Sequence, residues 1–229
     1  MSTLNAYYTI PKKGAVMRYF LILLLTLSLS QSAFAISGEK IISNIKDNYK
    51  KMKSFEADFT QVQIWELAAE ESRVSGKIYM KNDDSFRVEM PEGDYVLSNG
   101  KTVWRYSVEN KQVLIEDIKD SDDAMLPGKL FFDFADKYDL KDYFEKKDDG
   151  KTVYFLELIS PKDKQRFIDR LKVKVSSDFL PYEIEYFDLD DNKTTFILDS
   201  VRINIEAAED KFRFVKNEGT DVIDLRKKK

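Results

Sequence analysis

The sequence predicts a mainly β protein with helices, of the α+β class, in which helical segments cover one face of a single curved antiparallel sheet. From residue 54 onward, apolar and charged side chains alternate with a period of two through most of the chain. Such alternation in successive strands is typical of an antiparallel sheet with one dry and one wet face. Only two segments have helical spacing, one before residue 54 and one at residues 122–138, and linkers rich in Pro, Gly or Ser are absent. We therefore expect residues 36–229 to form a single domain.

Residues 1–35 have the pattern of a secretory signal peptide. A short apolar core is followed by the small residues Ala33 and Ala35, which mark a cleavage site. The core is shorter than the roughly 20 apolar residues that a membrane span needs. We expect cleavage after Ala35 and no stable membrane insertion; the alternative is an uncleaved anchor helix. Three basic residues precede the core: Lys12, Lys13 and Arg18.

The residue after the expected cleavage site is Ile36, where a bacterial lipoprotein has a cysteine. The chain contains no cysteine. Because a lipid anchor of that kind and a disulfide both need cysteine, we expect a protein that is exported and released with neither. Translation could begin at Met1 or at Met17, since residues 1–16 resemble a dispensable leader.

The charge of the chain argues against nucleic acid as a partner. Without the three basic leader residues, 34 of the 37 basic residues remain against 41 acidic ones, a net charge of −7. Nucleic-acid-binding domains carry basic patches, whereas the lysines here are dispersed. The terminal cluster at 226–229 is interpreted as a solvated tail.

The usual catalytic and metal-binding residues are also missing. The absence of His and Cys excludes Ser–His and Cys–His nucleophiles and the usual zinc sites. Residues 188–192, "DLDDN", resemble the start of a calcium loop but lack the glycine and glutamate that such a loop needs. Glu183 and Glu185 alternate with apolar residues, which places them on the wet face of a strand. We expect no enzyme activity, no metal and no cofactor.

The first folded element is an amphipathic helix. Its apolar residues recur at helical spacing, and Ser37 is placed to cap the N-terminus. The apolar stripe consists of Ile41, Ile42, Ile45, Tyr49 and Met52.

The strands begin with "SFEADFTQ" at residue 54. The pair Asn99-Gly100 is a strong hairpin signal, and "TVWRY" after it places Trp104 and Tyr106 on one face and Arg105 on the other. The other apolar faces are predicted to consist of Phe55, Ala57 and Phe59; Ile78 and Met80; Phe86, Val88 and Met90; Leu171, Val173 and Val175; and Tyr182, Ile184 and Tyr186.

Residues 122–138, "DDAMLPGKLFFDFADKY", interrupt the strands with a short helical insertion that Pro127 and Gly128 break. Its apolar residues at helix-like spacing are Met125, Leu126, Leu130, Phe131 and Phe134. This insertion and the first helix must cover the apolar face of about ten strands. The sequence leaves open whether this face forms an ordinary core or encloses a cavity.

Four segments together resemble the outer-membrane lipoprotein carrier (LolA) family. They are "SFEADFTQ", "GKIYMKNDDSFRVEMP", "YVLSNGKTVWRYSVENKQV" and "KFRFVKNEGTDVIDL", which occur in the order and spacing of that family. The resemblance implies an incomplete antiparallel β-barrel with a helical lid over an apolar cavity.

The resemblance also implies a function. Members are soluble periplasmic chaperones that receive lipoproteins from an ATP-driven inner-membrane extractor of the ABC type, and we expect this protein to be a monomer. They shield the acyl chains and deliver them to an outer-membrane acceptor, itself a lipoprotein. Ile36 in place of cysteine fits the mobile carrier rather than the anchored acceptor.

Within the resemblance, Phe86 matches an aromatic residue at the cavity mouth, and Trp104 matches a hairpin tryptophan. Many members have an Arg-Pro pair that latches the lid, where this chain has Asn82 and Asp83. The expected lid residues are the five of the insertion given above. The expected cavity-lining residues are Phe55, Phe59, Ile78, Met80, Phe86, Val88, Met90, Trp104, Tyr106 and Val113.

Two other functions are open within the same fold: a periplasmic lipid-transfer protein and a sensor of mislocalised lipoproteins. From another class, a hydrolase that uses carboxylates alone would need a pair such as Glu183 and Glu185, for which the alternating pattern gives no support.

Overall fold

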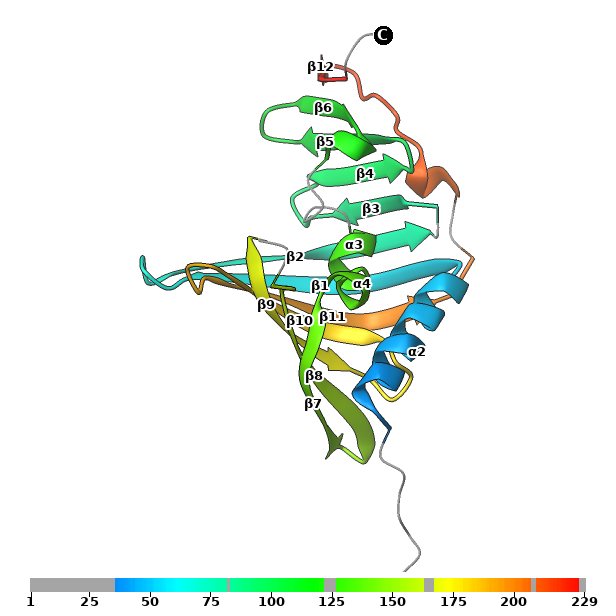
Figure 1. The fold of residues 1–229 in the computed structure, drawn as a ribbon. Coiled ribbons are helices and arrows are strands. Elements are labelled where there is room, and N and C mark those ends of the chain that lie inside the picture. The colour runs from blue at the N-terminus through cyan, green and yellow to red at the C-terminus, as the bar shows by residue number, and fades with distance from the viewer. Residues whose placement is uncertain (1–35, 82, 122–126, 163–166, 207–208, 227–229) are drawn as a thin grey trace, which may run out of the picture. The chain divides into compact units, whose positions relative to one another are not determined.

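The computed structural model describes residues 36–81, 83–121, 127–162, 167–206 and 209–226. Within these ranges the chain from Ser37 onward forms one sheet of twelve strands, with helices on one face (Figure 1). The strands are β1 (Ser54–Trp65), β2 (Glu70–Lys81), β3 (Ser85–Glu89), β4 (Tyr95–Asn99), β5 (Thr102–Ser107), β6 (Gln112–Asp117), β7 (Asp139–Asp148), β8 (Lys151–Ile159), β9 (Ile168–Val175), β10 (Pro181–Asp188), β11 (Lys193–Ile203) and β12 (Asp221–Asp224). The helices are α2 (Gly38–Lys51), α3 (Pro127–Phe131) and α4 (Phe134–Lys137), with 3-10 turns η1 (Ile118–Asp120) and η3 (Glu209–Phe212).

The strands follow the order β12-β6-β5-β4-β3-β2-β1-β11-β10-β9-β8-β7. Their pairing is antiparallel except that β12 runs parallel to β6. The sheet is open, with β12 and β7 as its two edges. The predicted antiparallel sheet is thus confirmed for β1 to β11, and β12 makes the whole sheet mixed. A parallel neighbour requires a crossover connection, which the chain between β11 and β12 supplies.

The N-terminal helix forms where the sequence predicts it. The backbone N–H of Lys40 donates to the Ser37 side-chain oxygen at 3.3 Å, so Ser37 is the N-cap. Ile41 and Ile45 are fully buried on the apolar stripe. The Asn48 side-chain amide donates to the carbonyl oxygen of Asp178 at 2.6 Å, which ties the helix to the turn between β9 and β10.

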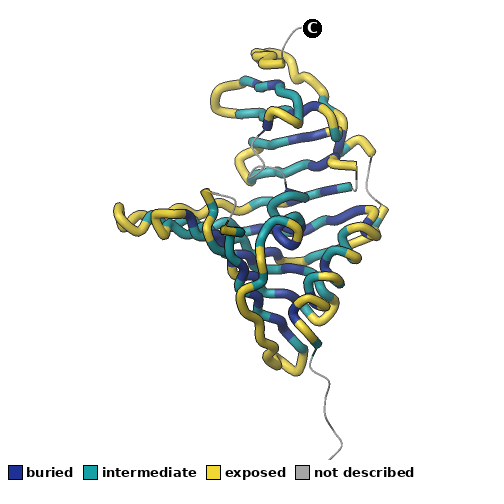
Figure 2. The backbone as a smooth tube through the Cα atoms, in the orientation of Figure 1, coloured by how far each residue is buried: buried dark blue, intermediate teal, exposed yellow. Residues whose placement is uncertain are grey.

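The strand register shows which side chains share a face, because directly opposed residues on neighbouring strands point the same way. Phe55 on β1 lies opposite Met80 on β2, and Met80 lies opposite Phe86 on β3. Phe59 lies opposite Leu198 on β11. These residues belong to the face that α2, α3 and α4 cover, called the helix face below. Figure 2 shows buried strand segments beneath these helices, whereas the protruding tip of the β1–β2 hairpin is exposed.

The other side of the sheet, called the opposite face, has a cover of its own over β2 to β6. The indole of Trp104 stacks on the ring of Phe214, with centroids 5.5 Å apart. Lys211 lies over the Tyr79 ring and also forms an ion pair with Glu89 at 3.1 Å. The segment 209–220 therefore forms a second apolar layer that the sequence did not predict.

No helix in the described ranges combines the length and the apolar character that crossing a bilayer requires.

Candidate functional site: the helix face and its lid

The lid, defined here as residues 127–138 with α3 and α4, lies on the helix face of the sheet (Figure 1). Three of its phenylalanines are almost completely buried: Phe131, Phe132 and Phe134 are 0%, 3% and 2% exposed. Because the helix breaks between α3 and α4, all three rings can point toward the sheet. The lid thus fills the space over the strands with aromatic side chains.

The lid rings contact both the sheet and α2. Phe132 stacks on Tyr49 of α2, with ring centroids 4.5 Å apart, and meets the ring of Phe55 edge-on at 6.0 Å. Phe131 meets Phe196 of β11 edge-on at 5.7 Å. Aromatic pairs in these geometries stabilise by roughly 0.5–1.5 kcal/mol beyond their buried area. The lid is therefore closed by packing of moderate strength.

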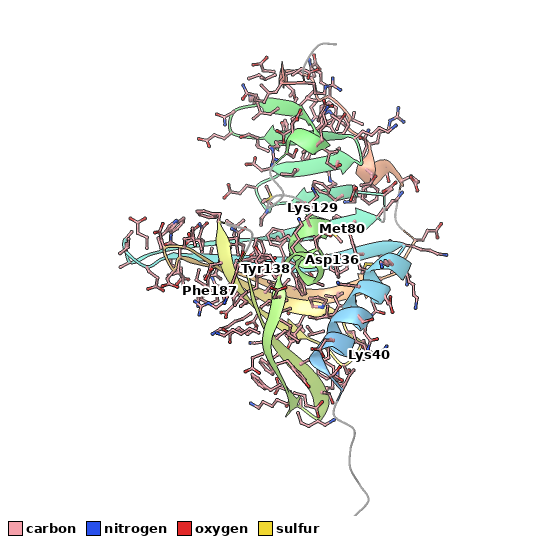
Figure 3. The ribbon with its side chains drawn as sticks, in the orientation of Figure 1. Lys40, Met80, Lys129, Asp136, Tyr138 and Phe187 are labelled. Carbon is pink, nitrogen blue, oxygen red and sulfur yellow. The ribbon has the colours of Figure 1, made fainter. Side chains whose placement is uncertain are left out.

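Three polar contacts fix the orientation of the lid. The Tyr186 hydroxyl donates to the carbonyl oxygen of Leu130 in α3. Lys46 of α2 forms an ion pair with Asp136 of α4 at 2.6 Å, and the Tyr138 hydroxyl donates to the Ile168 carbonyl at 3.4 Å. Figure 3 labels Asp136 and Tyr138 at α4 and the segment that follows it. Burial raises the pKa of Tyr186 well above its usual value, so its hydroxyl keeps the proton that it donates.

A small pocket remains between α2, the lid and strands β2 and β3. Its volume is about 20 Å³, which is room for one water molecule and not for an acyl chain. It is lined by Tyr49, Met80, Lys81, Asp84, Ser85, Phe86, Ile118, Gly128 and Lys129. Figure 3 labels two of these lining residues, Met80 and Lys129. An acyl chain could reach the strands beneath the lid only if the lid moved.

Glycine at position 128 permits the close approach of α3 to α2. A Cβ atom on Gly128 would lie 2.5 Å from the Tyr49 hydroxyl oxygen, well inside contact distance. Burial, with smaller contributions from Asp133 and Asp84, raises the pKa of Tyr49 to about 12. The Tyr49 hydroxyl is therefore neutral at physiological pH.

An arginine–glutamate pair lies on the helix face over β5 and β6. Arg105 of β5 is opposite Val96 on β4 and Leu114 on β6, so it shares their face. Its Nε and Nη2 atoms donate to Glu116 at 2.9 and 2.8 Å. The Ser121 hydroxyl, near the start of the insertion, donates to the same Glu116 oxygen at 2.8 Å. This Arg105–Glu116–Ser121 cluster was not predicted as part of the site.

The structure brings most of the predicted cavity-lining residues together on the helix face. Phe55, Phe59, Ile78, Met80 and Phe86 are between 2% and 6% exposed there. Val88 lies opposite Ile78 and is partly exposed. Met90 follows β3 and, with Phe59 and Gly76, lines a surface pocket.

Three predicted cavity-lining residues lie elsewhere. Trp104, Tyr106 and Val113 are on the opposite face, because Trp104 is opposite Leu97 and Ile115, and Tyr106 is opposite Val113. Trp104 is covered by Phe214 and not by the lid. The prediction assumed that the apolar side of "TVWRY" faces the helices, but Arg105 is on that side.

Only some of the expected lid residues lie among the described residues. Leu130 and Phe131 lie in α3, and Phe134 lies in α4. Met125 and Leu126, and also Asn82, fall outside the described residues. Phe132 and Tyr49 contribute ring contacts that were not assigned to the site, although Phe132 stands in the quoted insertion and Tyr49 on the predicted stripe.

The calcium-like stretch is a polar turn in the structure. Asp188 accepts hydrogen bonds from the backbone N–H groups of Asp190 and Asn192, both at 2.9 Å. The carboxylates of Glu183 and Glu185 pair with Lys174 and Lys193 on the face away from the helices. Among the described residues no cluster of three potential ligands could hold a metal ion.

The chain is similar to a known protein family and to several individual proteins. Residues 50–215 match the family described as "Outer membrane lipoprotein carrier protein LolA". An outer-membrane lipoprotein carrier protein from Azotobacter vinelandii is 27% identical over 213 residues, covering 90% of this chain and 99% of that one.

Two further relatives are uncharacterized. One from Methanocaldococcus jannaschii is 26% identical over 201 residues, and this chain, covered to 82%, spans about half its length (54%). A crystal structure of a conserved protein from Thermus thermophilus aligns with a TM-score of 0.54 at 14% identity, covering 82% of this chain and 99% of that one. This last likeness shows the fold alone.

Proposed function

The chain belongs to the outer membrane lipoprotein carrier (LolA) family, and on that premise we propose that it binds the acyl chains of lipoproteins and carries them between membranes. In this proposal the protein collects lipoproteins that an ABC-type extractor releases from the inner membrane. It then crosses the periplasm and delivers them to an outer-membrane acceptor. Residues 1–35 serve as the signal peptide, cleaved after Ala35, and the mature protein is a soluble monomer that needs no cofactor and catalyses no reaction.

The observation that carries the proposal is an apolar face covered by a lid that is not part of the sheet. Phe131, Phe132 and Phe134 occupy the surface over Phe55 and Phe196 that an acyl chain would otherwise cover. Lid and acyl chain compete for the same strands, so binding one displaces the other.

The competition gives the affinity that a carrier needs. Each methylene removed from water contributes about 0.8 kcal/mol, so one fully buried sixteen-carbon chain gains roughly 12 kcal/mol. Several chains at this value would exceed any affinity that permits release. The free energy of lid closure is subtracted from that gain, and cargo can pass to an acceptor without nucleotide hydrolysis at this protein.

The test is to purify the protein from periplasm and identify bound molecules by native mass spectrometry. Copurified lipoproteins, lost when their acyl chains are removed, support the proposal. Free phospholipid as the sole ligand would favour the lipid-transfer alternative and contradict the carrier role.

A further inference from the structure

We propose that Arg105 contacts the carbonyl oxygens of the ester groups that join the acyl chains to their cargo. The proposal rests on the carrier function above and assigns a specific polar contact to the same face. It starts from an unusual position: a guanidinium within the sheet face that the helices cover. Its cross-strand neighbours Val96 and Leu114 are both apolar.

Only two of the three guanidinium nitrogens of Arg105 have a hydrogen-bond partner. Nε and Nη2 donate to Glu116, but Nη1 is buried and has no hydrogen-bond partner. Among the described residues this is the one buried side-chain nitrogen or oxygen without a partner. Leaving a buried polar group unpaired destabilises a protein, and more so when the group is charged. A donor retained at such a cost is expected to have an acceptor in another state of the protein.

The chemistry of that acceptor follows from the charge of the cluster. Glu116 already neutralises Arg105, and its carboxylate would repel a phosphate or a second carboxylate. A guanidinium N–H can only donate. The acceptor that fits is therefore an uncharged oxygen atom. The carbonyl oxygen at the head of an acyl chain is such an acceptor.

The position of Arg105 fits the head of the chain rather than its tail. Glu116 is two residues before Ile118, which lines the small pocket together with Phe86 and Gly128. Ser121 is three residues after Ile118 and directly precedes the insertion, and its hydroxyl donates to Glu116. Carbonyl groups held at Arg105 would leave the hydrocarbon tails to run over Phe86 and Phe55 under the displaced lid.

The experiment compares two synthetic lipopeptides that differ in one feature. The first carries two palmitoyl esters and one palmitoyl amide; in the second, ether links replace the two esters and the neutral amide is kept. A charge-assisted hydrogen bond supports a preference of about tenfold for the ester form in dissociation constant. Dissociation constants are measured by displacement of an apolar fluorescent dye. A phosphatidylcholine with two palmitoyl esters and its diether form a second arm.

A matched pair of variants isolates Arg105. Arg105→Met/Glu116→Gln removes both charges of the helix-face pair. Arg87→Met/Glu89→Gln removes an arginine–glutamate pair of similar exposure on the opposite face, joined at 2.5 Å, and with it the ion pair between Glu89 and Lys211. We expect the first variant to lose the ester preference while binding the ether form as wild type does, and the second to keep the preference.

Each outcome has one meaning. Equal binding of both lipopeptides to the wild type overturns this inference and leaves the carrier function intact, whereas binding of neither contradicts the carrier function. Survival of the preference in the Arg105 variant, or its loss in the Arg87 variant, also overturns the inference. A preference in the lipopeptide arm alone supports a contact reserved for lipoproteins; a preference in both arms supports a contact to acyl esters from either source.

Discussion

The sheet has two aromatic covers, and they are attached in different ways. On the helix face the lid contacts α2 and the strands through rings and a few side-chain hydrogen bonds, such as that from Tyr186 to Leu130. On the opposite face the segment 209–220 is followed by β12, which hydrogen-bonds to β6 through its backbone. Ion pairs from Lys81 and Lys211 add to that attachment.

On the proposed function, this difference separates a removable cover from a permanent one. Lifting the lid breaks no strand pairing, whereas lifting the C-terminal segment would break the ladder between β12 and β6. Local opening of low free energy is expected where few backbone contacts must be broken. The helix face is thus the face suited to exchange, and the opposite face is part of the permanent core.

The largest expected effect comes from the permanent cover. Trp104→Ala should lower the free energy of unfolding by about 3 kcal/mol, because it removes a large ring stacked on Phe214. Urea denaturation measures this change. Binding of an acyl dye by the folded variant should match wild type; a loss of binding there would mean that the opposite face takes part in loading.

The matched substitution in the lid should act on exchange. Phe132→Ala removes the ring that contacts Tyr49 and Phe55, and weakens lid closure. We expect dye uptake about tenfold faster, which corresponds to about 1.4 kcal/mol of lost closure. Stopped-flow fluorescence measures the rate. Uptake at the wild-type rate would show that the lid is as fixed as the C-terminal segment.

A steric clash introduced into the lid should have a smaller effect on dye uptake than Phe132→Ala, and a second substitution should relieve it. In Gly128→Ala the new methyl group would lie 2.5 Å from the Tyr49 hydroxyl oxygen, so the Tyr49 side chain or α3 must shift; this loosens their contact, and dye uptake should speed up severalfold. Adding Tyr49→Phe removes that oxygen and should return the rate toward wild type. A double variant that is as fast as Gly128→Ala would argue against this contact as the cause.

The smallest expected effect is a change in the rate of dye uptake at high pH. Because the pKa of Tyr49 is raised to about 12 when the lid is closed, closure favours the protonated hydroxyl. This contribution is fully present below pH 10, the ordinary value for tyrosine, and is lost as the pH rises toward about 12. Dye uptake should accelerate over that window, and less so in Tyr49→Phe; the buried Tyr186 accounts for the remainder. The same acceleration in both proteins would exclude Tyr49 as a source.

The sequence predicted the regular parts of the helix face well. Period-two alternation predicts the faces of Phe55, Met80 and Phe86, and the helical stripe predicts the burial of Ile41 and Ile45. These patterns depend only on local geometry and solvent, so they can be read without knowledge of the fold.

The errors occurred where both sides of a strand are covered. On β5, Val103 is fully buried on one face while Trp104 stacks on Phe214 on the other, so alternation could not tell which face the helices cover. The C-terminal cover depends on a long crossover to a strand of four residues, and no local pattern signals such a contact. Arg105 looked like a wet-face residue because its partner Glu116 is eleven positions away.

Hydrogen exchange of the protein with and without a palmitoylated lipopeptide tests most directly whether the lid is the removable cover. The backbone amides of residues 128–138 should exchange faster when the lipopeptide binds, while those of β12 and its neighbours on β6 keep their protection. Unchanged or slower exchange in the lid, with the lipopeptide bound, would contradict the claim that lid and acyl chains compete for the helix face.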